Sequence, residues 1–347
     1  MPSTDLWLAA PGARSWTCPP APSAPAAFHA GLPGYAPTPL HDLPALAAEC
    51  GVRRVLVKDE SARFGLPAFK ALGVSYAIHR VLGERIGGPA PELVAATDGN
   101  HGWAVAAFAR RLGLRAQIVV PRGADPRAVA AIHAEQAAVT VLDGDYDAAV
   151  RRAAAEADSR LAAVLVQDTA WPGYTRIPQW IVDGYSTLLV EIDAQLAALG
   201  EPAPALVVTP MGVGSLAQAV VTHHRGRGTG TALLGVEADT AACVLASLVA
   251  GRPCTVPTGA TAMHGLNCGT PSALAWPYLR DGLDAVVAVS DGRSADAVRD
   301  LAALGVPAGP CGAASLAAVR AVPDHARARL GLTARSTVVL LSTEAAR

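Results

Sequence analysis

The chain of 347 residues carries little net charge and has no long apolar run. Its 28 basic side chains are almost balanced by 29 acidic ones, which gives a formal net charge of −1. A protein that binds nucleic acid should show a basic excess or a basic face, so the balance argues against that class. No apolar run reaches the roughly 20 residues that cross a bilayer, and the first residues do not resemble a secretory signal. We therefore expect a cytoplasmic protein with neither nucleic acid nor membrane as partner.

Clustered cysteines are also absent. The six cysteines are far apart along the chain, at Cys18, Cys50, Cys243, Cys254, Cys268 and Cys311. None has the close Cys or Cys/His spacing of a zinc site, so we expect no metal. The simplest expectation is six reduced, mostly buried thiols in a reducing compartment. Sequence alone leaves a disulfide between Cys243 and Cys268 open.

Lysine is the scarcest charged residue: the chain has 26 arginines but only two lysines, Lys58 and Lys70. Arginine stays protonated at neutral pH, whereas a lysine amine can lose its proton and form a Schiff base. The two lysines are therefore candidates for positions that arginine cannot serve. Lys70 follows a Gly/Pro loop, and apolar neighbours such as Phe64 and Phe69 should lower its pKa and favour a nucleophilic amine. The alternative is a lysine that only lies along a helix surface.

Short apolar segments alternate with helical patterns through most of the chain. We expect strands at 52–58, 93–96, 116–120, 138–142, 163–166, 205–209, 233–237, 285–289 and 337–341. We expect helices at 41–50, 68–82, 103–112, 126–134, 145–157, 177–199 and 215–224. The first 35 residues or so, rich in proline, alanine and glycine, should form an irregular arm. This alternation is typical of an α/β protein whose parallel sheets are covered on both faces.

Three polar or glycine-rich segments follow expected strands: TDGNHG at 97–102, QDTAW at 167–171 and GVGS at 212–215. In parallel α/β sheets, ligands bind at the carboxyl ends of strands, where helix N-termini present free N–H groups. GVGS suits one phosphate, but it lacks the third glycine of GxGxxG and the lysine of a P-loop, which disfavours dinucleotides and nucleoside triphosphates. Each segment alone is also compatible with a simple helix cap or tight turn.

Taken together, these segments resemble the fold type II family of pyridoxal-phosphate enzymes, and within it the diaminopropionate ammonia-lyase branch. The resemblance covers nearly the whole chain, in the order PGYAPTPL, VLVKDESARFGLPAFKALGVSYAI, ATDGNHGWAVA, VQDTAWPGYTRIPQWIVDGYSTL, GVGS, HGLNCGTPS and LLSTE. General dehydratases of the family usually show S-x-G-N-H where this chain has TDGNH, and Asp98 favours the diaminopropionate branch. Two departures are Trp103, where the branch usually has arginine, and the ending STEAA in place of an STEG-type motif.

The resemblance implies an α/β fold of the tryptophan synthase β-like type, with two domains. Residues 1–82 and 206–347 would form the large, cofactor-binding domain, and residues 83–205 a small inserted α/β domain. Because the family is usually dimeric, a homodimer is expected by analogy.

The resemblance also implies a cofactor, pyridoxal 5′-phosphate, held covalently by Lys70. Its phenolic oxygen would contact Asn100, and its pyridine nitrogen would face Ser342, with Thr343 as the second choice. Its phosphate would bind the loop formed by Gly212, Val213, Gly214 and Ser215. The catalytic acids and bases would be Asp98 and Asp168, and the substrate-binding residues would be these two together with Thr97, Gly99 and His101.

The reaction implied is α,β-elimination of 2,3-diaminopropionate, or a related β-substituted alanine, to pyruvate and ammonia through aminoacrylate. On opposite faces of the substrate, Asp98 and Asp168 could serve opposite enantiomers, and a nearby carboxylate favours the protonated leaving amine. The alternatives within the fold are a β-replacement synthase and a serine or threonine dehydratase-like enzyme of amino-acid or natural-product biosynthesis. A cofactor-free binding protein is the alternative outside catalysis.

Overall fold

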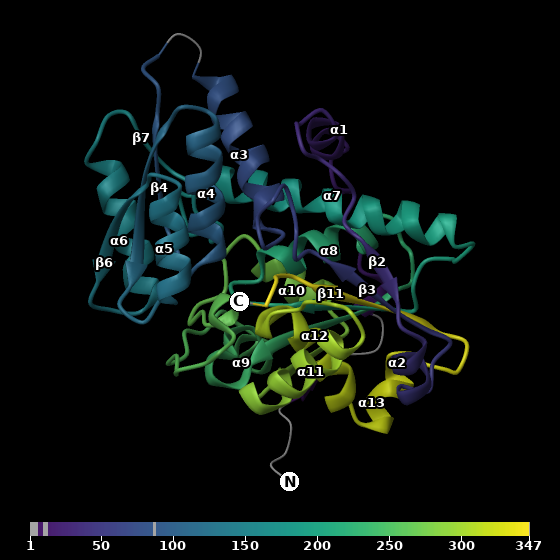
Figure 1. Cartoon of the computed structure of the whole chain (residues 1–347). Helices are drawn as coiled ribbons and strands as arrows, with labels where there is room; N and C mark the ends of the chain where they lie inside the picture. Colours follow the sequence, from purple (N-terminus) through teal and green to yellow (C-terminus); the bar gives the residue numbers. More distant parts are fainter. Residues whose placement is uncertain (1–5, 10–12, 86–87, 347) are drawn as a thin grey trace.

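Two sheets organise the chain, and Figure 1 shows them side by side. The computed structural model describes residues 6–9, 13–85 and 88–346. The larger sheet has the strand order β1 (Leu6–Leu8), β10 (Ala285–Val289), β9 (Ala232–Ala238), β8 (Leu206–Pro210), β11 (Thr337–Ser342), β3 (Arg54–Asp59) and β2 (Leu40–Asp42). The smaller sheet has the order β6 (Ala138–Leu142), β5 (Arg115–Pro121), β4 (Glu92–Ala96) and β7 (Ala163–Leu165).

Most strand pairs are parallel, and only the edge strands β1 and β2 pair antiparallel with their neighbours. The strands β8, β9, β10 and β11 are buried along their whole length, as their valine- and leucine-rich sequences require when helices cover both faces. The expected α/β fold with parallel-rich sheets is confirmed.

Thirteen helices are described around the two sheets. They are α1 (Ala24–Ala30), α2 (Pro44–Glu49), α3 (Lys70–Glu84), α4 (Asn100–Arg111), α5 (Pro126–Ala134), α6 (Tyr146–Asp158), α7 (Arg176–Ala198), α8 (Ser215–Arg225), α9 (Cys243–Ala250), α10 (Trp276–Gly282), α11 (Asp291–Ala303), α12 (Pro310–Ala321) and α13 (Asp324–Arg329). Asp125 and Asp145 cap α5 and α6, where their side chains accept hydrogen bonds from backbone N–H groups of the first turn. Within the described residues, no helix is both long and apolar enough to cross a membrane.

The N-terminal segment differs from the expected irregular arm. It contains α1 and the strand β1, which pairs with β10 far away in the sequence. The helix expected at 41–50 is shorter, because residues 40–42 form the edge strand β2. Both edge strands are only three residues long, which is too short for a clear local pattern, and β1 depends on a partner far away in the sequence.

The helices α3 and α7 pack closely because a glycine on each lets the backbones approach. A Cβ atom on Gly184 would lie 2.6 Å from the carbonyl oxygen of Leu72 and 2.8 Å from the Cα atom of Gly73. The helix α7 also packs on α8 and α1.

The smaller sheet takes all its strands from the segment 83–205, and the larger sheet takes none from it. The domain boundaries themselves stay a prediction.

Candidate functional site

A cavity of about 740 Å³, counted out to its open mouth, lies where strands of both sheets end. Its walls include segments that follow β4, β7, β8 and β11, together with the first residues of α3. The cavity is lined by all of the predicted site residues except Ser342, namely Lys70, Thr97, Asp98, Gly99, Asn100, His101, Asp168, Gly212, Val213, Gly214 and Ser215.

Lys70 begins α3, and its ammonium forms an ion pair with the carboxylate of Asp168. Burial lowers the pKa of Lys70, but the attraction of the Asp168 carboxylate outweighs it, and the pKa lies above its ordinary value. The expectation of a lowered pKa is therefore wrong. Apolar neighbours are present, but the charge of Asp168 has the larger effect on the pKa of Lys70. Burial by itself raises the pKa of Asp168, yet the Lys70 ammonium reverses this effect and leaves the pKa below its ordinary value.

Asp168 is surrounded by further polar groups. The Tyr146 hydroxyl donates to Oδ1 of Asp168 at 3.4 Å, and Nδ1 of His101 lies 3.7 Å from Oδ2. Nε2 of His101 donates to the carbonyl oxygen of Val166 at 2.7 Å, which leaves Nδ1 without a proton in the neutral ring. Burial lowers the pKa of His101, so the neutral form prevails. The Ser215 hydroxyl donates to the backbone carbonyl oxygen of Asp168 and ties it to the start of α8.

Asp98 lies half-buried in the same cavity and has a different electrostatic environment. Burial, together with the negative charges of Asp147 and Asp145, raises the pKa of Asp98 to about 7. At neutral pH this carboxyl group exists in both protonation states, whereas Asp168 stays ionised. Two carboxyl groups whose environments separate their pKa values are suited to different acid–base roles.

The loop of residues 211–215 connects β8 to α8 and forms one wall of the cavity. Gly214 has a φ of 95°, in the left-handed region that favours glycine. A Cβ atom on Gly212 would lie 2.9 Å from both Sγ of Cys268 and the carbonyl oxygen of Gly265, so no side chain fits there. The first N–H groups of α8 lack partners within the helix. A glycine loop that leads into a helix N-terminus is suited to bind a phosphate.

Ser342 ends β11, directly before Thr343, which lines the cavity. Its side chain is buried, and its hydroxyl oxygen has no hydrogen-bond partner among the residues that the structure describes. Buried hydroxyl groups are normally hydrogen-bonded, so this one is suited to a ligand atom. A Cβ atom on Gly312 would lie 2.8 Å from the Ser342 hydroxyl oxygen, so a glycine is needed beside it.

Several cavity residues were not found from the sequence. Nδ2 of Asn100 donates to Oε2 of Glu344 at 2.5 Å, and the Cys311 N–H donates to Oε1 of Glu344 at 3.2 Å. Glu344 belongs to the LLSTE segment, but nothing local indicated this contact. Tyr146 lies outside every motif and is brought to the cavity by α6. The remaining lining residues without a predicted role include His264 and Cys268.

Trp103 does not line the cavity. Trp103 is part of α4, and its partly buried side chain packs against the hydrophobic core. The tryptophan that stands in place of the usual arginine therefore forms no part of the cavity wall.

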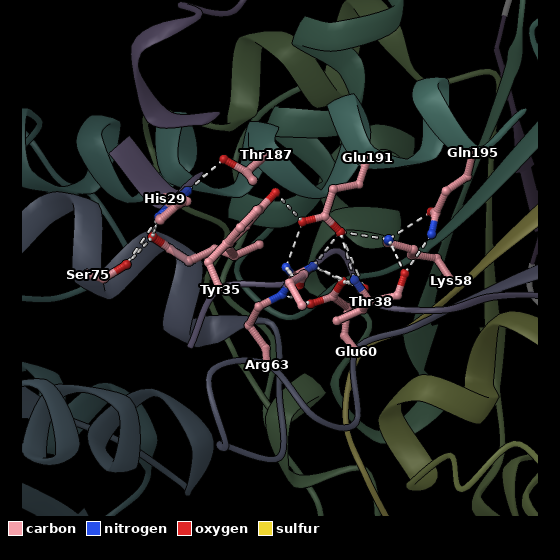
Figure 2. A network of polar contacts seen from close by, with 12 residues as sticks. His29, Tyr35, Thr38, Lys58, Glu60, Arg63, Ser75, Thr187, Glu191 and Gln195 are labelled. Atoms are coloured by element: carbon pink, nitrogen blue, oxygen red, sulfur yellow. Dashed lines mark hydrogen bonds and ion pairs between the residues drawn. The ribbon is translucent and has the colours of Figure 1, made fainter. Parts of the chain in front are cut away.

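The second lysine, Lys58, lies in a buried network of ion pairs, shown in Figure 2. Its ammonium donates to Oε2 of Glu191 at 2.7 Å, to the carbonyl oxygen of Thr38 at 2.8 Å and to Oε1 of Gln195 at 3.0 Å. It does not line the cavity. Of the two lysines, only Lys70 is placed for chemistry there.

All six cysteines are free thiols, so Cys243 and Cys268 are not bridged. Three of the six are buried and three are partly exposed, which corrects the expectation that most would be buried. The buried three are Cys243, Cys268 and Cys311.

A lysine paired with a carboxylate, a glycine loop at a helix N-terminus and a buried free hydroxyl together fit pyridoxal phosphate. The sequence matches the family of pyridoxal-phosphate dependent enzymes over residues 32–344, and the chain belongs to that family. The expected fold type and cofactor are thereby confirmed.

Within this family, the chain is similar to diaminopropionate ammonia-lyases. The chain is 39% identical to that of Salmonella typhimurium, over 80% of this chain and 74% of the relative. It is 37% identical to that of Escherichia coli K12, over 91% and 86% of the two chains. A solved structure of the Escherichia coli enzyme, in complex with an aminoacrylate-PLP azomethine reaction intermediate, has a TM-score of 0.90 at 35% identity and covers 99% of this chain and 94% of that chain.

Proposed function

We propose that this protein catalyses the α,β-elimination of 2,3-diaminopropionate, which with one water gives pyruvate and two molecules of ammonia. The observation that carries the proposal is the pair of carboxyl groups, Asp168 and Asp98, which share one cavity with Lys70 but have opposite pKa shifts. A substrate with two ammonium groups is complementary to two carboxylates. The relatives named diaminopropionate ammonia-lyase support the choice of substrate.

The residues of the cavity fit the cofactor as follows. Lys70 would hold pyridoxal phosphate covalently, and the N–H groups of residues 212–215 would bind its phosphate. Asn100 would contact the phenolic oxygen, and the Ser342 hydroxyl, or that of Thr343, the pyridine nitrogen. When bound, the cofactor supplies an electron sink that stabilises negative charge at the substrate α-carbon.

The protein's own groups then handle the protons. Asp168 is ionised and is suited to accept a proton or to hold an ammonium group of the substrate. Asp98, with a pKa of about 7, is suited to exchange a proton at neutral pH, either with the α-carbon or with the departing β-amino group. Thr97, Gly99 and His101 surround the same space and would bind the substrate carboxylate and orient it.

The test is to incubate the purified enzyme with each enantiomer of 2,3-diaminopropionate and to measure pyruvate and ammonia. We expect pyruvate without any added nucleophile, and about two ammonia per pyruvate, as the balance of the elimination requires. Asp98→Asn and Asp168→Asn should each reduce the rate, with a different preference between enantiomers if the two carboxylates act on opposite faces. No pyruvate from either enantiomer, together with a new amino acid when a thiol nucleophile is added, would replace elimination by β-replacement.

The proposal also includes the compartment, the oligomeric state and the domain division of the enzyme. The enzyme works in the cytoplasm, where its free thiols remain reduced. It is a homodimer, by analogy with its fold family. Its residues 83–205 form the smaller domain. Sedimentation of the holoenzyme at several concentrations tests the dimer.

A further inference from the structure

Tyr185, on α7, has a buried hydroxyl group that the proposed reaction does not use. Its side chain is completely buried, and its hydroxyl makes no hydrogen bond within 3.5 Å among the described residues, although Lys70 lies close enough to act on its pKa. The Lys70 ammonium lies 5.8 Å from the centre of the Tyr185 ring, and the Phe69 ring lies 4.7 Å from it. The tyrosine therefore stands directly beside the residue that would hold the cofactor.

The backbone fixes the position of this ring. A Cβ atom on Gly73, one helical turn after Lys70, would lie only 2.5 Å from Cε1 of Tyr185. The close contact between Gly184 and Leu72 holds α7 against α3 at the same level. Tyr185 cannot move far without separating the two helices, whereas the Lys70 side chain has four rotatable bonds.

Burying the Tyr185 hydroxyl lowers the stability of the folded protein, and a phenylalanine at this position would not have this effect. An unpartnered buried hydroxyl loses its hydrogen bonds to water and gains none in return. A phenylalanine ring would fill the same space without this loss. The hydroxyl is therefore expected to serve a partner in another arrangement of the site, and Lys70 is a long polar side chain beside it.

Lys70 needs such a partner during the proposed reaction. When a substrate amine takes the place of Lys70 on the cofactor, the free amine would return to Asp168, its ion-pair partner here. That ion pair would occupy the carboxylate that the substrate requires. A second partner for the amine would leave Asp168 available.

We propose that the Tyr185 hydroxyl is this second partner: it holds the amine of Lys70 while the substrate occupies the cofactor. Tyr185 thus acts as a positioning residue, and its role rests on Lys70 as the attachment point in the proposed function. Burial keeps the pKa of Tyr185 above its ordinary value, so the phenol is neutral at working pH. A neutral phenol can accept a hydrogen bond from an ammonium group and donate one to a neutral amine.

The test compares Tyr185→Phe with Tyr76→Phe, which removes the hydroxyl of another buried tyrosine, on α3, whose contact is with Arg80. In stopped-flow absorbance, we follow the return of the lysine-bound cofactor after a limiting pulse of substrate. We expect Tyr185→Phe to slow this return roughly three- to tenfold, the range set by one lost hydrogen bond. If the return limits turnover, kcat falls with it while kcat/KM stays unchanged. Tyr76→Phe should match the parent enzyme.

A second measurement does not depend on turnover. With ¹³C at the lysine ε-carbon, the full chain gives signals from only two lysines. In cofactor-free Asp168→Asn protein, where the amine has lost its first partner, adding Tyr185→Phe should shift the Lys70 signal and its titration, and Lys58 serves as the internal reference. The titratable groups that face Lys70 are Asp168, Tyr185, Cys268 and His101, and of these only Tyr185 differs between the two proteins compared.

Two results would overturn the proposal. One is an unchanged return rate together with an unchanged Lys70 signal. The other is a loss of thermal stability with shifts of both lysine signals, which would make the hydroxyl structural. A parent enzyme in which borohydride fixes no cofactor on Lys70 would instead refute the attachment point, so the two failures are distinguishable.

Discussion

The Lys70 ammonium and the Asp168 carboxylate form an ion pair between residues 98 positions apart in the sequence. Lys70 follows β3 of the larger sheet, and Asp168 follows β7 of the smaller one. The pair therefore joins the two sheets across the cavity. The pair also keeps both groups charged, because the Asp168 carboxylate raises the pKa of Lys70 and the Lys70 ammonium lowers the pKa of Asp168.

The first prediction concerns the titration of Lys70. Asp168→Asn removes the charge that holds the pKa of Lys70 above its ordinary value, so burial then dominates and the pKa falls. In cofactor-free protein, the ¹³Cε titration of Lys70 should move to lower pH. The Lys58 signal should not change, because its partner is Glu191. A Lys70 titration at the parent pH would show that Asp168 is not the controlling charge.

The second prediction concerns Asp98 and Asp147. The negative charge of Asp147 is one cause of the raised pKa of Asp98, second to burial. If ionised Asp98 is the working form, kcat/KM rises with pH through about 7. Asp147→Asn lowers the pKa of Asp98 and should move this rise to lower pH.

The control is Asp158→Asn, an exposed position at the other end of α6. It should leave the pH profile in place. A profile that shifts equally in both variants would point to general charge rather than to Asp147.

The third prediction concerns the phosphate loop. Gly212→Ala forces a Cβ atom against Cys268 and the backbone of Gly265, at 2.9 Å from each. Overpacking of this kind costs about 1–3 kcal/mol, and the loop must shift to relieve it. We expect roughly a tenfold or greater loss of cofactor affinity, measured by equilibrium dialysis.

Gly83→Ala is the matched control, because its Cβ atom would meet no atom within 4 Å. Alanine is the better helix former, so this variant should keep its cofactor and gain up to about 1 kcal/mol. Equal cofactor affinity in the two variants would contradict the role of Gly212.

The fourth prediction concerns the network of Figure 2, where Glu191 contacts both Lys58 and Arg63. Glu191→Gln leaves two buried cations with only Glu60 to compensate them. Removing one member of a buried ion pair costs about 3–5 kcal/mol, which urea unfolding would measure. Glu84→Gln, which breaks the exposed contact with Arg176, should cost less than about 1 kcal/mol.

The same carboxylate gives a pH dependence with a definite sign. Burial acts to raise the pKa of Glu191, but Arg63 and Lys58 outweigh it and lower the pKa below its ordinary value of 4.5. Its contribution to stability is therefore present above pH 4.5 and is lost as the pH falls through the lowered pKa. The parent should lose more stability than Glu191→Gln across this window. Parallel curves would contradict the assignment.

The strands and helices that the sequence predicted best are those with a strong local pattern. The helix at 126–134 and the strands at 138–142 and 285–289 have the predicted bounds. The cavity residues were predictable where they stand in segments that follow strands, as Thr97, Asp168 and Gly212 do. Parallel topology brings such segments to one edge of a sheet.

What the sequence could not predict depends on distant contacts. Tyr146 stands in no motif and reaches the cavity through the packing of α6, whereas Glu344 stands in the LLSTE segment, which gives no sign of its contact with Asn100. The pKa of Lys70 was predicted with the wrong sign, because its apolar neighbours are visible in the sequence and Asp168 is not. The sequence left the role of Lys58 open, and the structure places it beside Glu191.

The central claim is that Lys70 holds the cofactor, and borohydride reduction of the holoenzyme followed by peptide mapping tests it most directly. Because the chain has only two lysines, the assignment is unambiguous. The account predicts one pyridoxyl group per chain, on the peptide that contains Phe69, Lys70 and Ala71. A pyridoxyl group on Lys58, or none on protein saturated with the cofactor, would contradict it.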